Sequence, residues 1–305
     1  MKSYQRILVF LLLVLLCTIV MSPWAAILWN SIVEARPEWQ AYRPSFPHIF
    51  GRLFMVLGAV LFFLCRPLLK IQSVSQLGLK PSRQWHCDFA RGALIAVASV
   101  ITVAFLMSVL DVFTPFFRLS LSTALQRSVK ALLTALTVGF LEEIFFRGVI
   151  FKGLLDDCRL AVASVFSSLF YAAIHFIKPA EEISSSSLDA WAGLRYLVAA
   201  FQPFLDPASL FPGLFGLFLI GMVLSYAFFR TGSLYLSMGL HAGWVFGIKT
   251  IRVYGDFRRE DLGWLFGSFE PKLVSGVAVW IVILAVGLII HWITRKRQRL
   301  GSASH

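Results

Sequence analysis

Charged residues are scarce in this sequence. Asp, Glu, Lys and Arg make up 14% of its 305 residues, whereas 58% of the residues are apolar. A soluble domain carries roughly a quarter charged residues, so this composition excludes an ordinary soluble domain. The sequence therefore predicts an integral, multi-pass membrane protein.

Several motifs of known intramembrane proteases are also missing. The sequence contains no H-E-x-x-H of a zinc protease, no G-x-G-D of an aspartyl protease and no G-x-S-x-G nucleophile elbow. Its four cysteines show no C-x-x-C spacing, which indicates small apolar residues rather than a disulfide or metal site. Asn30 is its only asparagine.

The chain has an excess of positive charge, with a formal net charge of +12. Basic residues gather in the 66–91 loop and at the C-terminal tail, which is the pattern of cytoplasmic loops and not of a nucleic-acid-binding surface. The basic loop 249–272 does not fit the alternating sides of this topology. A compact chain of this kind is typical of a prokaryotic plasma membrane.

Long apolar runs account for most of the chain. A helix needs about 20 apolar residues to cross the hydrocarbon core, and the first run is longer than the core of a signal peptide. We therefore predict an all-α polytopic bundle of about eight transmembrane helices. The candidate segments are Ile7–Trp29, Ile49–Leu64, Phe89–Leu110, Ala131–Leu154, Leu160–Ile177, Leu210–Phe229, Leu234–Ile248 and Leu273–Ile293.

The chain divides into three parts by composition and motif. Residues 1–130 hold the N-terminal spans, residues 131–250 hold every candidate site residue, and residues 251–305 hold a loop, the last span and the basic tail. The longest non-spanning region, Lys178–Pro212, includes the serine run Ser184–Ser187. Within it, Leu188–Phe204 is predicted to form either a short interfacial helix or a re-entrant element.

Two adjacent glutamates and an arginine interrupt the span near residue 142. A charge at mid-span costs about 2.5–3.5 kcal/mol even on the mildest scale, so such groups need partners. Glu143 and Arg147 are four residues apart and stack on one helix face, which predicts an ion pair. Glu142 points about 100° away and is predicted to face a cavity. Gly148 is predicted to allow close approach of a neighbouring helix.

Two later spans each carry a histidine. His175 follows Tyr171 by one turn, and His241 follows Ser237 by one turn. A lone histidine is usually structural, but ionisable groups on three spans are expected to converge in one wet cavity. A glutamate and two histidines around water supply a general base, an orienting partner and a donor for an oxyanion.

This order of residues resembles the CAAX-processing and bacteriocin-processing family of intramembrane endopeptidases. The resemblance rests on Glu142-Glu143-x-x-x-Arg147 and the two downstream histidines, and it covers roughly residues 132–248. It implies a glutamic peptidase without a catalytic metal or other cofactor. Its partners would be the bilayer and a protein or peptide substrate at the membrane.

The resemblance also implies a role for each matching residue. Glu142 would activate the hydrolytic water with help from His175, and His241 would stabilise the oxyanion. Glu143, Arg147 and Tyr171 would support and orient the site.

Two positions depart from the family pattern. Tyr171 stands where the family has phenylalanine, and Val245 stands where it has asparagine or aspartate. Removing one oxyanion donor commonly costs about 10²–10³ in rate. A backbone N–H, Tyr171, Ser237 or Lys249 is a candidate replacement for the missing donor.

Other functions are compatible with the same residues. Zinc held by Glu142, His175 and His241 is a chemically reasonable site. Buried glutamate and histidine also build proton relays, so a non-catalytic scaffold, an immunity protein or a proton-linked transporter remains an alternative. The sequence does not indicate the oligomeric state or the cleavage site.

Overall fold

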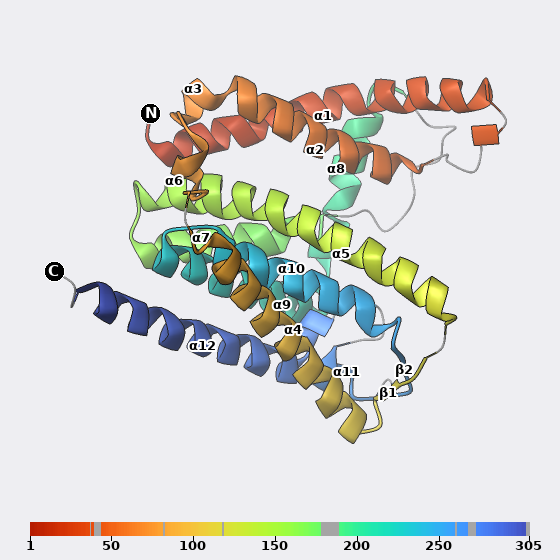
Figure 1. The fold of residues 1–305 in the computed structure, drawn as a ribbon. Helices are drawn as coiled ribbons and strands as arrows, with labels where there is room; N and C mark the ends of the chain where they lie inside the picture. The colour runs from red at the N-terminus through yellow and green to blue at the C-terminus, as the bar shows by residue number, and fades with distance from the viewer. Residues whose placement is uncertain are drawn as a thin grey trace. The chain divides into compact units, whose positions relative to one another are not determined.

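The computed structural model describes residues 1–36, 38–39, 44–81, 83–117, 119–177, 189–259, 261–267 and 273–302. These residues are mainly helical, as predicted (Figure 1). In chain order the elements are α1 (Ser3–Glu34), α2 (Phe46–Leu64), α3 (Arg66–Leu69), η2 (Val74–Leu77), α4 (Trp85–Val109), β1 (Phe113–Pro115), α5 (Leu121–Glu143), η3 (Ile144–Phe151), α6 (Lys152–Leu155), α7 (Leu160–Ile174), α8 (Ala192–Ala200), η5 (Gln202–Leu205), α9 (Pro207–Thr231), α10 (Tyr235–Ile251), β2 (Gly255–Phe257), α11 (Gly263–Phe266), η6 (Leu273–Ser275) and α12 (Val277–Ser302).

All eight predicted apolar segments contain a helix. By length and composition, five helices among the described residues are able to cross a membrane, namely α1, α2, α4, α9 and the first 19 residues of α12. Helices α7 and α10 are shorter, with 15 and 17 residues, and α5 carries Arg127, Lys130 and both glutamates. The all-α class is therefore confirmed, whereas the count of about eight spans remains a prediction.

Some of the sequence features fall outside the described residues. These are the Ser184–Ser187 run, part of the 249–272 loop and the side chains of the basic tail beyond Arg295.

The described chain forms two compact units. The first comprises Met1–Gln72 and Ala173–Leu210. In it α1 and α2 lie side by side and α8 packs on them (Figure 1). Aromatic rings hold this packing, with the centroids of Phe50 and Tyr196 4.5 Å apart.

The second unit comprises Ser73–Ala172 and Phe211–His305 and contains the glutamates and His241. Here α4 and α5 both pack against α10. Small residues permit this packing, because a Cβ added at Gly239 would overlap the carbonyl oxygen of Phe89, and one at Gly243 would lie 2.7 Å from that of Ala93. Close backbone approach at small residues is how membrane helices associate. It fixes α10, and so His241, against its neighbours.

This close approach predicts different effects on the thermal midpoint for two glycine-to-alanine changes. Gly239→Ala is expected to lower the thermal midpoint of the purified protein, because the new methyl group forces α10 away from α4. The matched change Gly51→Ala, on α2 with no heavy atom within 4 Å, is expected to leave the midpoint unchanged or raise it, since alanine favours helix by about 1 kcal/mol. Equal midpoints for both variants would contradict this packing.

A two-stranded sheet connects the segment between α4 and α5 with the segment that follows α10. Strand β1 pairs antiparallel with β2, with Phe113 opposite Phe257, and Ser128 of α5 hydrogen-bonds Tyr254 at 2.8 Å. Helix α5 begins at Leu121, ten residues before the predicted span, because Ser120 caps it by accepting from the Thr123 N–H.

Candidate functional site

Both glutamates lie at a change of helix type. Helix α5 ends at Glu143, and the chain continues without a break as the π-helix η3. Single π turns inside helices are rare and are frequent at functional sites. The Phe146 carbonyl in this turn accepts from the Ser167 hydroxyl of α7 at 3.5 Å, and Gly148 lies against Leu77 of η2. The neighbour predicted at Gly148 is thus a 3₁₀ turn rather than a spanning helix.

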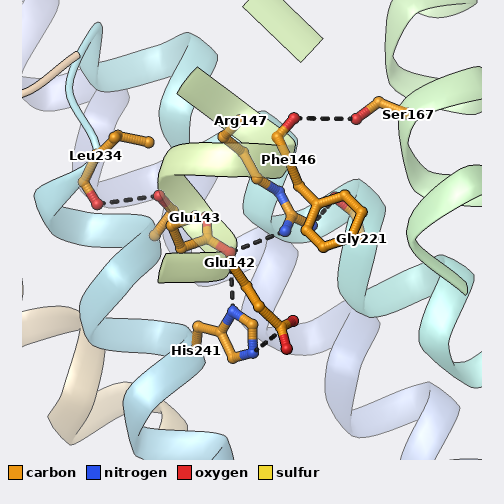
Figure 2. A network of polar contacts seen from close by, with 9 residues as sticks. Glu142, Glu143, Phe146, Arg147, Ser167, Gly221, Leu234 and His241 are labelled. Atoms are coloured by element: carbon orange, nitrogen blue, oxygen red, sulfur yellow. Dashed lines mark hydrogen bonds and ion pairs between the residues drawn. The ribbon is translucent and has the colours of Figure 1, made fainter. Parts of the chain in front are cut away.

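The predicted ion pair is present and fully buried. The Arg147 Nη1 donates to Glu143 Oε1 at 2.8 Å, and neither side chain is exposed (Figure 2). Arg147 Nη2 also donates to the Gly221 carbonyl of α9 at 3.3 Å. The guanidinium therefore joins three elements, η3, α5 and α9. Sequence reasoning missed Gly221, since nothing in its local sequence indicates a carbonyl that accepts from arginine.

His241 contacts both glutamates. Its Nδ1 lies 2.9 Å from Glu143 Oε1, and its Nε2 lies 3.7 Å from Glu142 Oε2 (Figure 2). An ionised carboxylate only accepts hydrogen bonds, so Glu143 keeps the proton of a neutral His241 on Nδ1 and leaves Nε2 as an acceptor. The expected convergence of ionisable groups does bring His241 to the glutamates, but its bond to Glu143 was not predicted.

The two glutamates differ in exposure. The Glu142 side chain is 30% exposed, whereas that of Glu143 is fully buried. The predicted pairing of Glu143 with Arg147 is confirmed, whereas the cavity predicted in front of Glu142 stays a prediction. The paired charges of Glu143 and Arg147 cancel, so Glu142 is the acidic group in this cluster with access to its surroundings.

The Tyr171 ring packs against two members of this cluster, Arg147 and His241. Its ring lies 4.6 Å from the Arg147 guanidinium carbon and meets the His241 ring edge-on, with centroids 6.1 Å apart. A guanidinium over an aromatic face is attracted by the ring quadrupole, by about 2 kcal/mol or more when desolvated. The aromatic ring at position 171 thus contacts both the Arg147 guanidinium and the His241 imidazole; its supporting role stays a prediction.

The remaining predicted residues lie elsewhere. His175 is half-buried in the turn after α7, in the segment that belongs to the first unit, whereas Glu142 and His241 belong to the second. Val245 is half-buried one turn beyond His241, and Lys249 is exposed. The Ser237 hydroxyl donates to the Leu234 carbonyl at 3.0 Å. Of the candidate replacements for the missing amide, Tyr171 is in ring contact with His241.

Residues 123–247 match the family model described as Rce1-like, type II CAAX prenyl endopeptidase Rce1-like. Residues 123–247 are therefore similar to that family. The matched Rce1-like core contains all the residues that the site brings together, from Glu142 to His241. No curated protein and no solved structure matches the chain.

The Rce1-like family implies a protease acting at a membrane, which agrees with the apolar helices of this chain. Within the described part of the chain, no group of three or more His, Cys, Asp or Glu residues is placed to hold a metal ion. The Rce1-like core instead offers carboxylate, imidazole and guanidinium groups that hydrogen-bond one another.

Proposed function

We propose that this chain is an intramembrane endopeptidase that hydrolyses peptide bonds with a water activated by Glu142. One observation carries the proposal. His241 lies between the two glutamates, bonded to the buried Glu143 and facing the buried Oε2 of Glu142, whose side chain is 30% exposed as a whole. A carboxylate and an imidazole that face each other from different helices form a pair suited to moving protons.

The distance between Glu142 and His241 leaves room for a bridging water. At 3.7 Å, the Oε2 and Nε2 atoms are too far apart for a direct hydrogen bond, and a water that contacts both satisfies them. Glu142 takes the proton of this water as it attacks the scissile carbonyl. Because Glu143 fixes the imidazole through Nδ1, Nε2 stays aimed at the reacting atoms, much as a buried carboxylate orients the histidine of a triad.

The later steps use the same groups. The tetrahedral intermediate carries an oxyanion, which a donor must stabilise; His241 serves in its doubly protonated form, in which the Nε2–H donates to the oxyanion and keeps its proton throughout the reaction. Collapse of the intermediate breaks the C–N bond, and the proton taken up by Glu142 passes to the leaving amine. The role of His175 stays a prediction from the family resemblance. Tyr171 holds the Arg147 guanidinium and the His241 ring in place.

The family match supports the choice of the first substrate to test. The Rce1-like family is described as CAAX prenyl endopeptidases, so a peptide ending in a prenylated Cys-a-a-X sequence is the first substrate to test. The peptide segment around the scissile bond must be extended and accessible for the bond to react. This favours a short C-terminal segment over a folded domain as the substrate. The cell membrane that holds this chain is proposed to be a prokaryotic plasma membrane.

The experiment is a cleavage assay with a metal control. The purified protein is incubated in detergent with a farnesylated peptide ending in Cys-a-a-X, its unprenylated twin and a panel of membrane-protein segments. Products are identified by mass spectrometry, with and without 1,10-phenanthroline. Cleavage that persists in the chelator supports a metal-free mechanism. Cleavage lost in the chelator and restored by zinc would replace it with a zinc site at Glu142 and the histidines.

A further inference from the structure

The C-terminal parts of α9 and α12 share a cluster of four polar side chains that the proposed reaction does not use. Tyr226 and Arg230 of α9 are one turn apart, as are His291 and Thr294 of α12. The Tyr226 hydroxyl and His291 Nδ1 lie 2.6 Å apart, and the two rings are nearly parallel, with an interplanar angle of 15°. Arg230 Nε donates to the Thr294 hydroxyl at 3.0 Å. These four residues are called the α9–α12 cluster.

The Arg230 guanidinium has no carboxylate partner in this cluster. Its contacts are the Nε bond to Thr294 and the face of the Tyr226 ring, whose centroid lies 5.9 Å from the guanidinium carbon. Its Nη2 is buried and has no hydrogen-bond partner. A guanidinium carries five N–H donors and stays charged, and a buried charged donor without an acceptor is unfavourable. We therefore expect an anion from outside the chain to meet this guanidinium.

The α9–α12 cluster lies at the level expected for lipid headgroups. Arg230 is the last residue but one of α9, and Thr294 is the last but one of the 19-residue part of α12 that is apolar enough to cross a membrane. Trp292, next to His291, is 70% exposed, and Arg295 is exposed one turn after His291. Tryptophan and basic residues gather where a helix leaves the hydrocarbon core, and phospholipid headgroups begin at that level.

We infer that the α9–α12 cluster binds the headgroup phosphate of an anionic phospholipid. Arginine binds phosphate through two parallel N–H donors, and Thr294 and the Tyr226 ring hold the guanidinium in one orientation. With the Tyr226 hydroxyl donating to His291 Nδ1, the imidazole proton stays on Nε2, which gives the cluster a second donor. The cluster has a positive charge and no carboxylate. Phosphatidylglycerol, whose headgroup has no cation of its own, therefore suits it better than phosphatidylcholine.

Lipid binding to the purified full-length protein tests this site. The protein in detergent is titrated with phosphatidylglycerol, phosphatidylcholine or inorganic phosphate. Native mass spectrometry counts the bound lipid, and the thermal midpoint reports stabilisation. Wild type is expected to retain phosphatidylglycerol in preference to phosphatidylcholine. Arg230→Gln is expected to weaken phosphatidylglycerol binding about tenfold or more, the usual effect of losing a hydrogen bond to a charged group. The matched variant Arg127→Gln removes an exposed arginine of α5 and is expected to bind like wild type.

Three results would overturn the inference. An equal loss of binding in Arg230→Gln and Arg127→Gln would indicate general attraction between anionic lipid and a basic protein. Equal binding of the two lipids by wild type would leave the guanidinium to ordered water. Stabilisation by inorganic phosphate as large as that by phosphatidylglycerol, and lost in Arg230→Gln, would replace the lipid with free phosphate. If Arg230→Gln does not fold, His291→Phe carries the same expectation, because it keeps a ring against Tyr226 and removes the imidazole donor.

Discussion

Replacing Glu142 with glutamine is expected to lower kcat for peptide cleavage by about 10²–10⁴-fold, the usual contribution of a positioned general base. Glutamine keeps the size and the hydrogen-bonding atoms of the side chain but does not accept a proton from water. The Glu142 side chain is 30% exposed, so the fold does not depend on its charge. KM is expected to change little, because the carboxylate acts on the water rather than on the substrate.

Two controls separate catalysis from folding. Thr137→Ala, an exposed position on α5 outside the cluster, is expected to retain wild-type kcat and thermal midpoint. Glu142→Gln is expected to retain the midpoint alone. Wild-type kcat in Glu142→Gln would remove Glu142 from the mechanism. A midpoint that falls together with kcat would instead assign Glu142 a structural role.

Replacing Arg147 with methionine is expected to destabilise the protein by about 3–5 kcal/mol, the typical effect of breaking a buried ion pair. Methionine fills the space, but it leaves the buried Glu143 carboxylate without its guanidinium partner, and only the donors His241 and Ser237 then remain for it among the described residues. It also removes the bond to the Gly221 carbonyl and the guanidinium over Tyr171. Unfolding in a denaturing detergent series measures the change.

The double variant Glu143→Gln with Arg147→Met tests the reason for that loss. If the cost comes from an uncompensated charge, removing both charges restores part of the stability that either single change removes, with a coupling energy of about 0.5–3 kcal/mol. Simple additivity of the two losses would contradict a direct pairing. Activity is expected to remain low in the double variant, since His241 loses the carboxylate that fixes its proton on Nδ1.

The helices were predictable because apolar length is a strong signal. Each of the eight apolar segments contains a helix, including the short ones at α7 and α10. The ends of the helices were less predictable. The early start of α5 depends on the Ser120 cap and on an amphipathic turn with Arg127, which a search for long apolar runs does not detect. The three-residue strands β1 and β2 pair across more than a hundred residues, which no local pattern indicates.

The site was predicted in part for a similar reason. The pairing of Glu143 with Arg147 follows from helical spacing, and the greater exposure of Glu142 follows from its different face. The bond from His241 to Glu143 depends on how α10 packs against α4 and α5, which is a tertiary arrangement. The π turn at Ile144 changes backbone hydrogen bonds without an evident sequence signal. The role of His175 stays a prediction.

A single turnover in H₂¹⁸O tests the central claim most directly. Excess purified protein is mixed with the farnesylated Cys-a-a-X peptide, or with the best substrate of the panel, and quenched before a second cycle. Direct attack by a Glu142-activated water predicts one ¹⁸O in the new carboxyl group of the product and an unmodified protein mass. A covalent adduct on the protein, a first-turnover product without ¹⁸O, or no cleavage of any peptide would contradict the account.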